Sequence, residues 1–477
     1  MKPVNQVRNA LAFLEDQPHH EQAFDTLIWG LRERRDAAAR EVPEWEDLRT
    51  LASRIKEHTL SHLADYLEQF EERATANGAR VHWARDAHEH NQIVYDILSA
   101  HRAHTLVKSK SMLTEECQMR PFLETRGIQV TETDLGERIQ QLDHQPPAHI
   151  VGPAFQKTAQ DVAEEFHRVY GSDPGRADPV YLAHVMRERT RPLILAADAG
   201  MTGANFAVAQ TGAVVTVTNE GNADLSGNVP GLRICSVGIE KIIPGLAELA
   251  MFIRLLTRSA TGERITQYTS HFAGPRAGGE MHIVLVDNGR TQRLADERFW
   301  PSLKCIRCAA CLNTCPVYRR SGGLAYGATY MGPIGLITMP AADVRRFREL
   351  PFSSTLNGSC SNVCPVQINI HEQIYAWREV MDADGLFSVT KKAAMKAAGA
   401  VLSHPRAWRA AAEAGDAALK VLPHFAMYNR VNAWGRHRDV PSTPKETFHQ
   451  WYARNRGDAR PPAQTPAQGE DPGHDRP

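Results

Sequence analysis

The stretch C-I-R-C-A-A-C-L-N-T-C-P, residues 305–316, decides how this chain is organised. Its spacing, C-x2-C-x2-C-x3-C-P, is the one by which bacterial ferredoxins hold iron–sulfur clusters. In that arrangement the first three thiolates bind one cluster and the fourth, which precedes a proline, binds a second, so a distant cysteine must complete the first. The motif cysteines are Cys305, Cys308, Cys311 and Cys315, and the distant candidates are Cys360 and Cys364, the latter again before a proline.

Zinc and disulfide chemistry are the two alternatives to this interpretation. A structural zinc site pairs two C-x2-C hooks in one tetrahedron, and this loop holds more thiols than one zinc ion can use. A disulfide framework is typical of short secreted chains, whereas this chain has 477 residues. Residues 1–14 contain one lysine and no apolar core, which argues against a secretory signal. We therefore predict iron–sulfur ligation in a reducing compartment.

Composition and charge exclude several classes of partner. Lysine plus arginine equals aspartate plus glutamate at 55 each, so the net charge is zero. That balance argues against nucleic acid or an anionic membrane surface as the main partner. No apolar stretch approaches the roughly 18 residues that a membrane-spanning helix needs. We expect a cytoplasmic protein without a transmembrane segment, whose only route to a membrane is through partner proteins.

Changes in composition and in the spacing of apolar residues along the chain predict five segments. The first has the spacing of amphipathic helices and is expected to pack on the next domain. The second alternates short β-rich runs with helices, which predicts a mainly parallel sheet covered on both faces. The cysteine region follows, then an alanine- and lysine-rich helical stretch and a polar tail that is expected to be disordered. The expected bounds are 1–78, 79–295, 296–385, 386–456 and 457–477.

Within the second segment, seven short runs are predicted to be strands. They are 80–83, 104–107, 149–151, 192–196, 213–218, 232–237 and 282–286. In the cysteine region, Asn369 with Glu372 three residues later predicts the start of a helix. Ile370, Ile374, Trp377 and Met381 would form its buried stripe. Cys117 and Cys235 lie in the α/β segment and are not expected to be ligands, and Cys235, inside an apolar strand, is expected to be a buried side chain.

Three polar loops follow predicted strands in this segment. They read K-S-K-S-M-L-T-E-E at 108–116, D-A-G-M-T-G-A-N at 198–205 and T-N-E-G-N at 218–222. Ligand sites of parallel sheets lie at the carboxyl ends of strands, so these loops predict a site for a partner or a small anion, unless they only connect strands. No G-x-G-x-x-G or Walker A motif occurs. The candidate residues are Lys108, Lys110, Thr202, Asn205 and, as a catalytic carboxylate, Glu220.

These motifs together resemble the lactate-utilisation protein B family, iron–sulfur proteins of bacterial L-lactate oxidation. The resemblance covers nearly the whole chain apart from the tail. It is carried by the cysteine motif extended to C-P-V-Y and by the three loops above. Further matches are T-D-L-G-E at 133–137, G-I-E-K at 238–241, D-N-G-R at 287–290 and W-G-R at 434–436.

The resemblance implies a fold, a cofactor and partners. The middle region is expected to be an LUD domain, related to the three-layer α/β fold of sugar-phosphate isomerases and coenzyme A transferases. The cysteine region is expected to be a helical two-cluster ferredoxin module. Family members act with a cysteine-rich subunit and a second LUD-type subunit. By the same resemblance, Cys305, Cys308, Cys311 and Cys364 would bind the first [4Fe–4S] cluster.

This chain departs from the family pattern at two positions. Many members have C-G-x-C-x3-C-P where this chain has Asn357 in the first position, so only Cys315 and Cys360 remain for a second cluster. Four outcomes stay open: an oxygen or nitrogen ligand from Asn357 or elsewhere, a ligand from a partner, a three-iron cluster, or no second cluster. Gln210 stands where related sequences often have glutamate, which leaves Glu220 as the carboxylate on the adjacent loop.

The predicted function is iron–sulfur electron transfer in the oxidation of L-lactate to pyruvate. The final electron acceptor is not specified by the sequence. Two alternatives remain. One is an acyl- or coenzyme A-transferring enzyme with Glu220 as nucleophile and structural clusters, and the other is a regulator that senses redox state through one cluster.

Overall fold

The computed structural model describes residues 3–16, 20–387, 389–428 and 444–456. They form two compact units, Met1–Leu386 and Phe387–Pro477. The predicted tail at 457–477 and the motif at 434–436 lie outside the described residues. The first unit contains all eight cysteines and all the candidate site residues.

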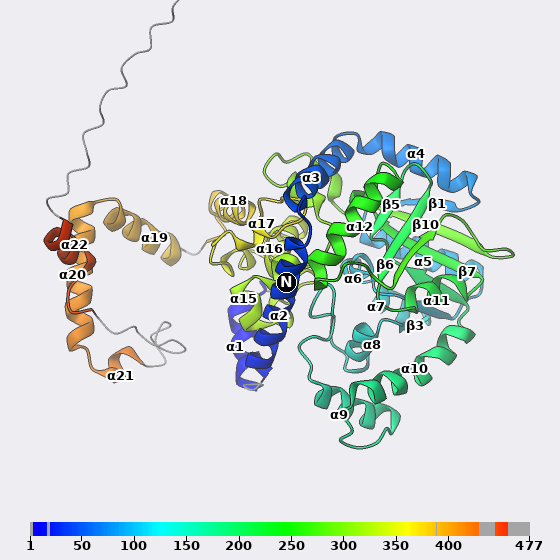
Figure 1. Ribbon diagram of the computed structural model, residues 1–477, viewed down its shortest axis with the longest axis horizontal. Helices are drawn as coiled ribbons and strands as arrows, with labels where there is room; N and C mark the ends of the chain where they lie inside the picture. Colours follow the sequence, from blue (N-terminus) through cyan, green and yellow to red (C-terminus); the bar gives the residue numbers. More distant parts are fainter. Residues whose placement is uncertain (1–2, 17–19, 388, 429–443, 457–477) are drawn as a thin grey trace, which may run out of the picture. The chain divides into compact units, whose positions relative to one another are not determined.

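Four helices begin the first unit, as the apolar spacing predicts: α1 (Gln6–Asp16), α2 (His20–Arg40), α3 (Trp45–Ser61) and α4 (Leu63–Ala76). They do not all pack on the following domain. Helices α3 and α4 contact that domain, α2 contacts both that domain and the cysteine region, and α1 lies against the cysteine region (Figure 1). Gln6 Nε2, for example, donates to Ser321 Oγ at 2.9 Å. The amino-terminal helices therefore join the two parts of the unit.

A six-stranded sheet forms the centre of the domain, and all its neighbouring strands are parallel. This confirms the predicted mainly parallel sheet. The strand order is β1-β10-β7-β4-β2-β3. The strands are β1 (Arg80–Ala84), β2 (Thr105–Lys108), β3 (Gln129–Glu132), β4 (Ala199–Thr202), β7 (Leu232–Gly238) and β10 (Glu280–Val286).

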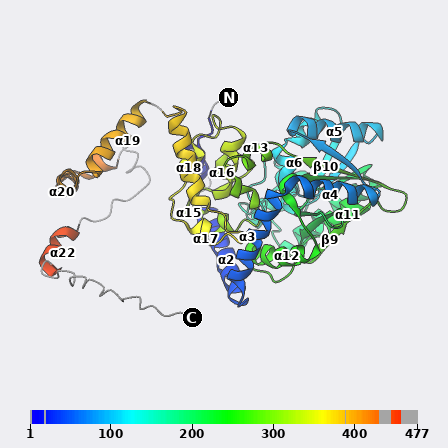
Figure 2. The same ribbon diagram turned by 90° about the horizontal axis from the view of Figure 1, so that it is seen from above.

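Different layers cover the two faces of this sheet (Figure 2). One face packs on the helices α5 (Ala87–Ala100), α6 (Met112–Glu116) and α7 (Met119–Glu124). The other packs on α4 and on a smaller sheet, β8-β5-β6-β9. The smaller sheet consists of β5 (Phe206–Val208), β6 (Ala213–Thr218), β8 (Ile242–Ile243) and β9 (Tyr268–Phe272), with α12 (Leu246–Thr261) against β5. Cys117 is buried in the first interface and Cys235, as expected, in the second.

Two of the strand predictions are wrong. Residues 192–196 are the last turns of α10 (Pro179–Ala196), and the neighbouring strand β4 starts three residues later. A short apolar run does not separate a strand from a helix end by periodicity, and Pro192 is tolerated within the helix. Residues 149–151 form bends, because the buried His149 ring holds the backbone: its Nδ1 accepts from the N–H groups of Val151 and Gly152 at 3.1 and 3.0 Å.

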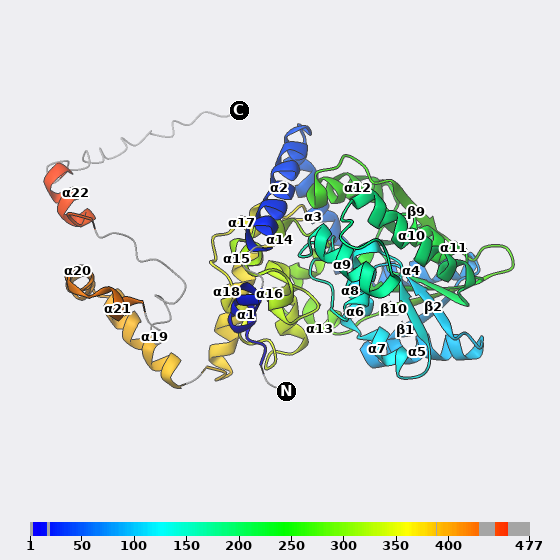
Figure 3. The ribbon, with the colours of Figure 1, turned by 90° about the horizontal axis from the view of Figure 1, so that it is seen from below.

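A small helical layer extends from the edge of the parallel sheet near β3. It contains α8 (Leu135–Leu142), α9 (Ala159–Tyr170) and α10, which pack through a cluster around Phe166 (Figure 3). Two short helices follow the sheet strands: α11 (Asn222–Asn228) after β6 and α13 (Arg290–Leu294) after β10. The turn η1 (Ile239–Lys241) follows β7. The loops before these elements face the site described below.

The cysteine region is helical and compact. It comprises η2 (Trp300–Lys304), α14 (Ala310–Asn313), α15 (Pro316–Ser321), η3 (Leu324–Tyr326), α16 (Gly332–Ala342), η4 (Leu350–Phe352), α17 (Ser359–Asn362) and α18 (Ile370–Ala383). Helix α18 begins after Asn369 and buries the predicted stripe. Asn369 Nδ2 donates to Glu372 Oε2 at 2.8 Å, so this pair meets through side chains and not through a backbone cap.

The second unit contains α19 (Val389–Leu402), α20 (Pro405–Val421), α21 (His424–Met427) and α22 (Phe448–Arg456). Helices α19, α20 and α22 have no buried residues. Among the described residues, no helix is both long and apolar enough to cross a membrane.

Candidate metal centre and ligand cavity

Four cysteines from two distant stretches line one small cavity: Cys305, Cys308, Cys311 and Cys364. The remaining wall is largely apolar and includes Ile306, Ile334, Val366 and Ile368. The structure thus brings together the thiols that the spacing and the family resemblance select for one cluster. An apolar shell excludes water, which is one of the features that set the potential of an iron–sulfur centre.

The backbone around these thiols adopts left-handed turns at residues that are not glycine. Arg307 has φ 60° and Ala309 has φ 62°, between the first three cysteines, and Gln367 has φ 49° after Cys364. Such turns direct successive N–H groups to one side, as anion-binding backbone nests do. Arg307 N donates to Cys305 Sγ and Ile368 N to Cys364 Sγ, both at 3.4 Å. The loops therefore offer N–H donors to sulfur, a second determinant of cluster potential.

The thiols are spaced more widely than a single zinc ion requires. Four thiolates on one zinc ion lie about 3.8 Å apart, since each Zn–S bond is about 2.3 Å and the geometry is tetrahedral. In the described residues, no three of these sulfur atoms lie within 4.8 Å of one another. Burial raises the pKa of Cys308 and of Cys311 well above the usual thiol value. Ligation must therefore displace protons, as metal binding to thiols does.

Buried cations surround the four thiols. Arg49 donates from Nε and Nη2 to the carbonyl oxygen of Cys364 at 3.1 and 2.9 Å. Arg35 Nη2 donates to Val363 O at 3.1 Å. Both arginines come from the amino-terminal helices. Burial lowers the pKa of Lys56 to about 7 and that of Lys241 to about 8, although the nearby Glu240 opposes both shifts. These groups would offset the negative charge of a thiolate-bound cluster.

The other two motif cysteines, Cys315 and Cys360, lie together outside this cavity. Burial and the neighbouring Cys315 raise the pKa of Cys360 to about 11. Asn357, which stands in the position of a family cysteine, is exposed, and its Oδ1 accepts from Ser359 N at 3.1 Å at the start of α17. Tyr318 N donates to Cys315 Sγ at 3.5 Å. The described residues thus bring two thiols to this position.

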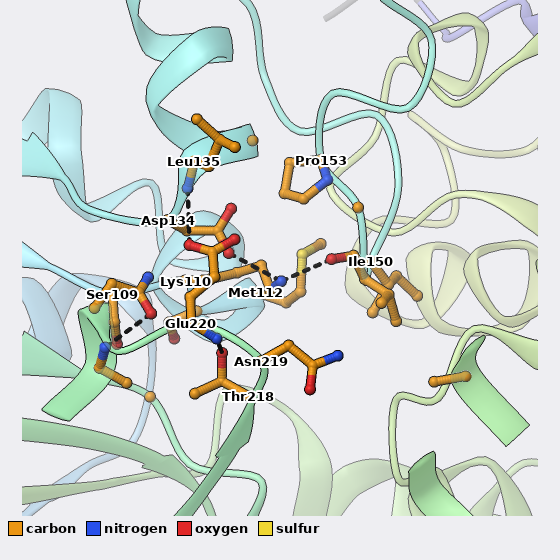
Figure 4. A pocket seen from close by; sticks show the side chains of 18 of the residues that line it. Ser109, Lys110, Met112, Asp134, Leu135, Ile150, Pro153, Thr218, Asn219 and Glu220 are labelled. Atoms are coloured by element: carbon orange, nitrogen blue, oxygen red, sulfur yellow. Dashed lines mark hydrogen bonds and ion pairs between the residues drawn. The ribbon is translucent and has the colours of Figure 1, made fainter. Parts of the chain in front are cut away.

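A larger cavity of about 610 Å³ lies at the carboxyl ends of the sheet strands. Lys110, Asn205 and Glu220, three of the five predicted loop residues, line it. Lys110 Nζ donates to Asp134 Oδ2 at 3.1 Å and to Val151 O at 2.7 Å (Figure 4). Asn205 Oδ1 accepts from Val217 N at 2.8 Å, which fixes that side chain to β6.

Glu220 is the candidate acid–base group of this cavity. Its Oε2 accepts from Leu135 N at 3.2 Å, and its carboxyl group points toward Asp134 and Lys110 (Figure 4). Burial and the charge of Asp134 raise the pKa of Glu220 to about 7, while Lys110 opposes the shift. A carboxyl group with this pKa can both accept and donate a proton near neutral pH.

The other two predicted loop residues do not line the cavity. Lys108 is fully buried, and its ammonium group lies 2.8 Å from Glu132, 3.2 Å from Glu137 and 3.6 Å from Glu115. Thr202 is also buried, with its hydroxyl 3.3 Å from Cys235 Sγ. Both residues support the strands behind the loops. Gln210 is likewise not among the lining residues; its Oε1 accepts from Leu246 N at 3.2 Å at the start of α12.

The sequence did not single out the charged wall of the cavity. Glu240, Lys241, Arg290, Arg307 and Tyr330 line it. Arg290 forms an ion pair with Glu240 and a two-pronged pair with Glu116, from Nη1 at 3.0 Å and Nη2 at 3.1 Å. Tyr330 OH donates to the same Glu116 carboxylate at 2.7 Å. The motifs G-I-E-K and D-N-G-R could have indicated this wall, because each places charged residues directly after a strand.

The two cavities share part of their walls. Arg307 and Ile150 line both the ligand cavity and the four-thiol cavity. Ile150 follows His149, whose Nε2 lies 3.2 Å from Asn313 Oδ1 in α14. The segment that was predicted to be a strand at 149–151 is therefore one of the contacts between the α/β domain and the cysteine region.

Known proteins show the same combination of domains. Family models match residues 67–293 as an LUD domain, 301–368 as a 4Fe-4S dicluster domain and 373–457 as the C-terminal part of lactate utilisation protein B. A lactate utilization protein B of Geobacillus thermodenitrificans (strain NG80-2) is 41% identical over 436 residues, 89% of this chain and 91% of that protein. The chain belongs to the lactate utilization protein B family.

Another relative carries a different name. An uncharacterized electron transport protein, YkgF, of Escherichia coli (strain K12) is 39% identical over 426 residues, 87% of this chain and 89% of that protein. The six motif cysteines lie in the dicluster segment and the loop residues in the LUD segment. This family membership makes the chain an iron–sulfur protein of lactate utilisation.

Proposed function

We propose that this chain is an electron-transfer subunit in the oxidation of L-lactate to pyruvate. Its partners would be a cysteine-rich lactate-utilisation protein and a second LUD-type protein. A [4Fe–4S] cluster held by Cys305, Cys308, Cys311 and Cys364 would supply one-electron transfer. The observation that carries the proposal is the shared wall of the two cavities, because Arg307 belongs both to the thiol loop and to the ligand cavity.

The charges of the cavity support a small carboxylate or a similar anion as its ligand. Lys241 lines the cavity and, within the part of the chain that the structure describes, has no hydrogen bond and no ion pair within 4 Å. Arg307 Nη1 is buried without a hydrogen-bond partner. An anion between these two cations would satisfy both. It would also lie beside Cys305, whose charge interacts with both groups.

Anaerobic purification followed by iron and sulfide analysis tests the cofactor. The proposal expects at least four iron and four sulfide per chain and an electron paramagnetic resonance signal after reduction. About eight iron with two signals would establish two clusters, and about four with one signal would restrict the chain to the first cluster. Zinc in place of iron would refute the proposal.

The variant Cys308→Ser tests the function in cells that depend on this protein for growth on L-lactate. Growth should be abolished, because a buried ligand of the first cluster is lost. Cys117→Ala is a matched control, since Cys117 is equally buried but lies in the domain core away from the cavity. Normal growth of the Cys308→Ser strain would contradict a role in electron transfer.

Acyl transfer with Glu220 as nucleophile is the second candidate function. It is favoured by the position of Glu220 on the cavity wall, held by Leu135 N. The raised pKa acts against it, because only the ionised carboxylate attacks an acyl group and the protonated form is substantial at neutral pH. Incubation with an acyl-coenzyme A and mass spectrometry decides between the two: an adduct on Glu220 supports transfer, and an unmodified Glu220 supports electron transfer alone.

A further inference from the structure

A group of potential metal ligands lies at the edge of the parallel sheet where the strands begin. It consists of His101, at the carboxyl end of α5, with Glu280 and His282 at the start of β10. One ligand atom of each residue lies within 4.8 Å of the others. The ligand cavity is at the opposite, carboxyl ends of the strands, so this group is separate from the site described above.

Both imidazole rings have one nitrogen already engaged. His101 Nδ1 lies 2.8 Å from Ile97 O, and because a carbonyl oxygen only accepts, Nδ1 carries the proton. His282 Nδ1 lies 2.9 Å from Nε2 of His82, whose ring stacks on it at 12°. The Nε2 atoms are thus the free positions of both rings. Metal-binding histidines show this pattern, in which the second nitrogen is oriented by a hydrogen bond.

The free nitrogens face the carboxylate of Glu280. His101 Nε2 lies 3.3 Å from Glu280 Oε1, and His282 Nε2 lies 3.6 Å from Glu280 Oε2. A tetrahedral zinc ion with bonds of about 2.0 to 2.1 Å separates neighbouring ligand atoms by about 3.3 Å. The distances from Glu280 therefore already approach those of a zinc shell.

A buried nitrogen atom in this group has no hydrogen-bond partner. The side chain of His282 is 4% exposed, and its Nε2 makes no hydrogen bond. Such orphaned polar atoms are rare and call for a missing partner. The facing oxygen of Glu280 lies 3.6 Å from this nitrogen, beyond hydrogen-bond distance. A cation between the two atoms would satisfy both.

The surroundings of this group favour a positive charge. His101 caps the carboxyl end of α5, where the helix dipole favours positive charge. Arg80 competes for the site, because its Nη1 lies 2.8 Å from Glu280 Oε2. The Arg80 side chain is 64% exposed, however, so it can move into solvent at little cost.

We propose that His101, Glu280 and His282 bind a divalent transition-metal ion, zinc in preference to calcium or magnesium. Two imidazoles and one carboxylate are a ligand set of zinc enzymes, whereas the hard cations prefer oxygen alone. Water occupies the remaining position, on the exposed side of the site. The ion ties the end of α5 to the start of β10 and belongs to neither thiol set.

Zinc titration of the full-length protein, purified anaerobically with its iron–sulfur centre intact and treated with a chelator, tests the proposal. A chromophoric zinc indicator reports the affinity, and iron content is followed in parallel. The wild type should take up one zinc per chain without losing iron. His101→Ala and Glu280→Gln, both at partly exposed positions that leave the core intact, should each weaken binding at least tenfold. His82→Phe, which removes only the orienting contact, should weaken it 10- to 100-fold.

His58→Ala combined with His62→Ala is the matched control. These exposed histidines also lie close together, with ring centroids 4.5 Å apart, but without a carboxylate between them. Zinc binding should be unchanged in this variant. X-ray absorption at the zinc edge should show nitrogen and oxygen ligands. Zinc bound through sulfur, zinc uptake that expels iron, or equal affinity of the His101→Ala variant would each overturn the proposal.

Discussion

Glu220 connects the chemistry of the cavity to the pH dependence of stability. Burial and Asp134 raise its pKa to about 7, against about 4.3 in an unfolded chain. Between these values the folded protein binds more protons than the unfolded one, so stability falls as pH rises from about 4.5 to 7. The glutamine of Glu220→Gln cannot ionise. The free energy of unfolding of this variant, relative to that of the wild type, should therefore rise by about 1 to 3 kcal/mol between pH 5 and pH 8.

Thermal unfolding of both proteins at pH 5 and pH 8 measures this effect. The melting temperature of Glu220→Gln relative to the wild type should rise by a few degrees between the two pH values. Glu297→Gln, an exposed carboxylate outside the cavity, is the control and should show no such change. A constant difference between Glu220→Gln and the wild type would mean that Glu220 is ionised throughout this range.

Arg307 is the residue through which a ligand and the first cluster would influence each other. Its guanidinium group lies over the Tyr330 ring at 4.3 Å and interacts with the charge of Cys305. Replacing it with glutamine removes one positive charge beside the thiol loop. The reduction potential should fall by roughly 50 to 100 mV, the effect of one charge at about 7 Å with an effective dielectric constant near 20.

A redox titration followed by electron paramagnetic resonance measures this potential. Arg298→Gln is the control, because Arg298 precedes the same loop but is exposed and pairs with Asp296. An anion bound in the cavity should lower the wild-type potential more than that of the Arg307→Gln variant. Equal potentials in wild type and Arg307→Gln would separate this residue from the redox centre.

At the level of elements, the close contact of α11 with β4 positions Glu220. A Cβ atom on Gly200 would lie 1.7 Å from the carbonyl oxygen of Ser226, which is backbone and cannot rotate away. Helix α11 begins just after Glu220, so Gly200→Ala must displace the loop that carries it. We expect this substitution to lower the free energy of unfolding by about 1 to 3 kcal/mol, which is typical of overpacking.

Gly30→Ala is the matched substitution, because a Cβ there meets nothing within 4 Å. Gly30 lies inside α2, where alanine should stabilise the protein by about 0.5 to 1 kcal/mol. Melting temperatures should therefore shift in opposite directions. Quenching of the fluorescence of Tyr268, which lies beside Gly221, would additionally report movement of the Glu220 loop. A Gly200→Ala protein as stable as the wild type would show that α11 adjusts freely.

The sequence predicted elements where the pattern is local and missed them where tertiary contacts decide. The motif spacing and the family resemblance together selected the four thiols of one cavity, and largely apolar strands such as β7 and β10 were found. Strand β4 was missed because its residues, 199–202, are small and lack that pattern. Arg307 and Lys241 were missed as cavity residues, because they meet only when the cysteine region packs on the α/β domain.

At the scale of the whole molecule, the first unit contains everything that the proposed chemistry needs. Both thiol sets and the ligand cavity lie before Leu386, and the amino-terminal helices α1 and α2 hold the cysteine region from the other end of the chain. In the second unit, α19, α20 and α22 bury no side chains. We therefore expect the first unit to fold without these helices.

A protein ending at Leu386 should keep the iron content of the full chain. Its melting temperature should stay within about 2 °C of that of the full chain, since hardly any buried area is lost.

A protein starting at Glu41 should behave in the opposite way. It lacks Arg35 and Gln6, whose hydrogen bonds reach Val363 and Ser321 in the cysteine region. It should lose iron during purification. If the carboxyl-terminal truncation lost iron and the amino-terminal one did not, the cysteine region would depend on the second unit and not on α1 and α2.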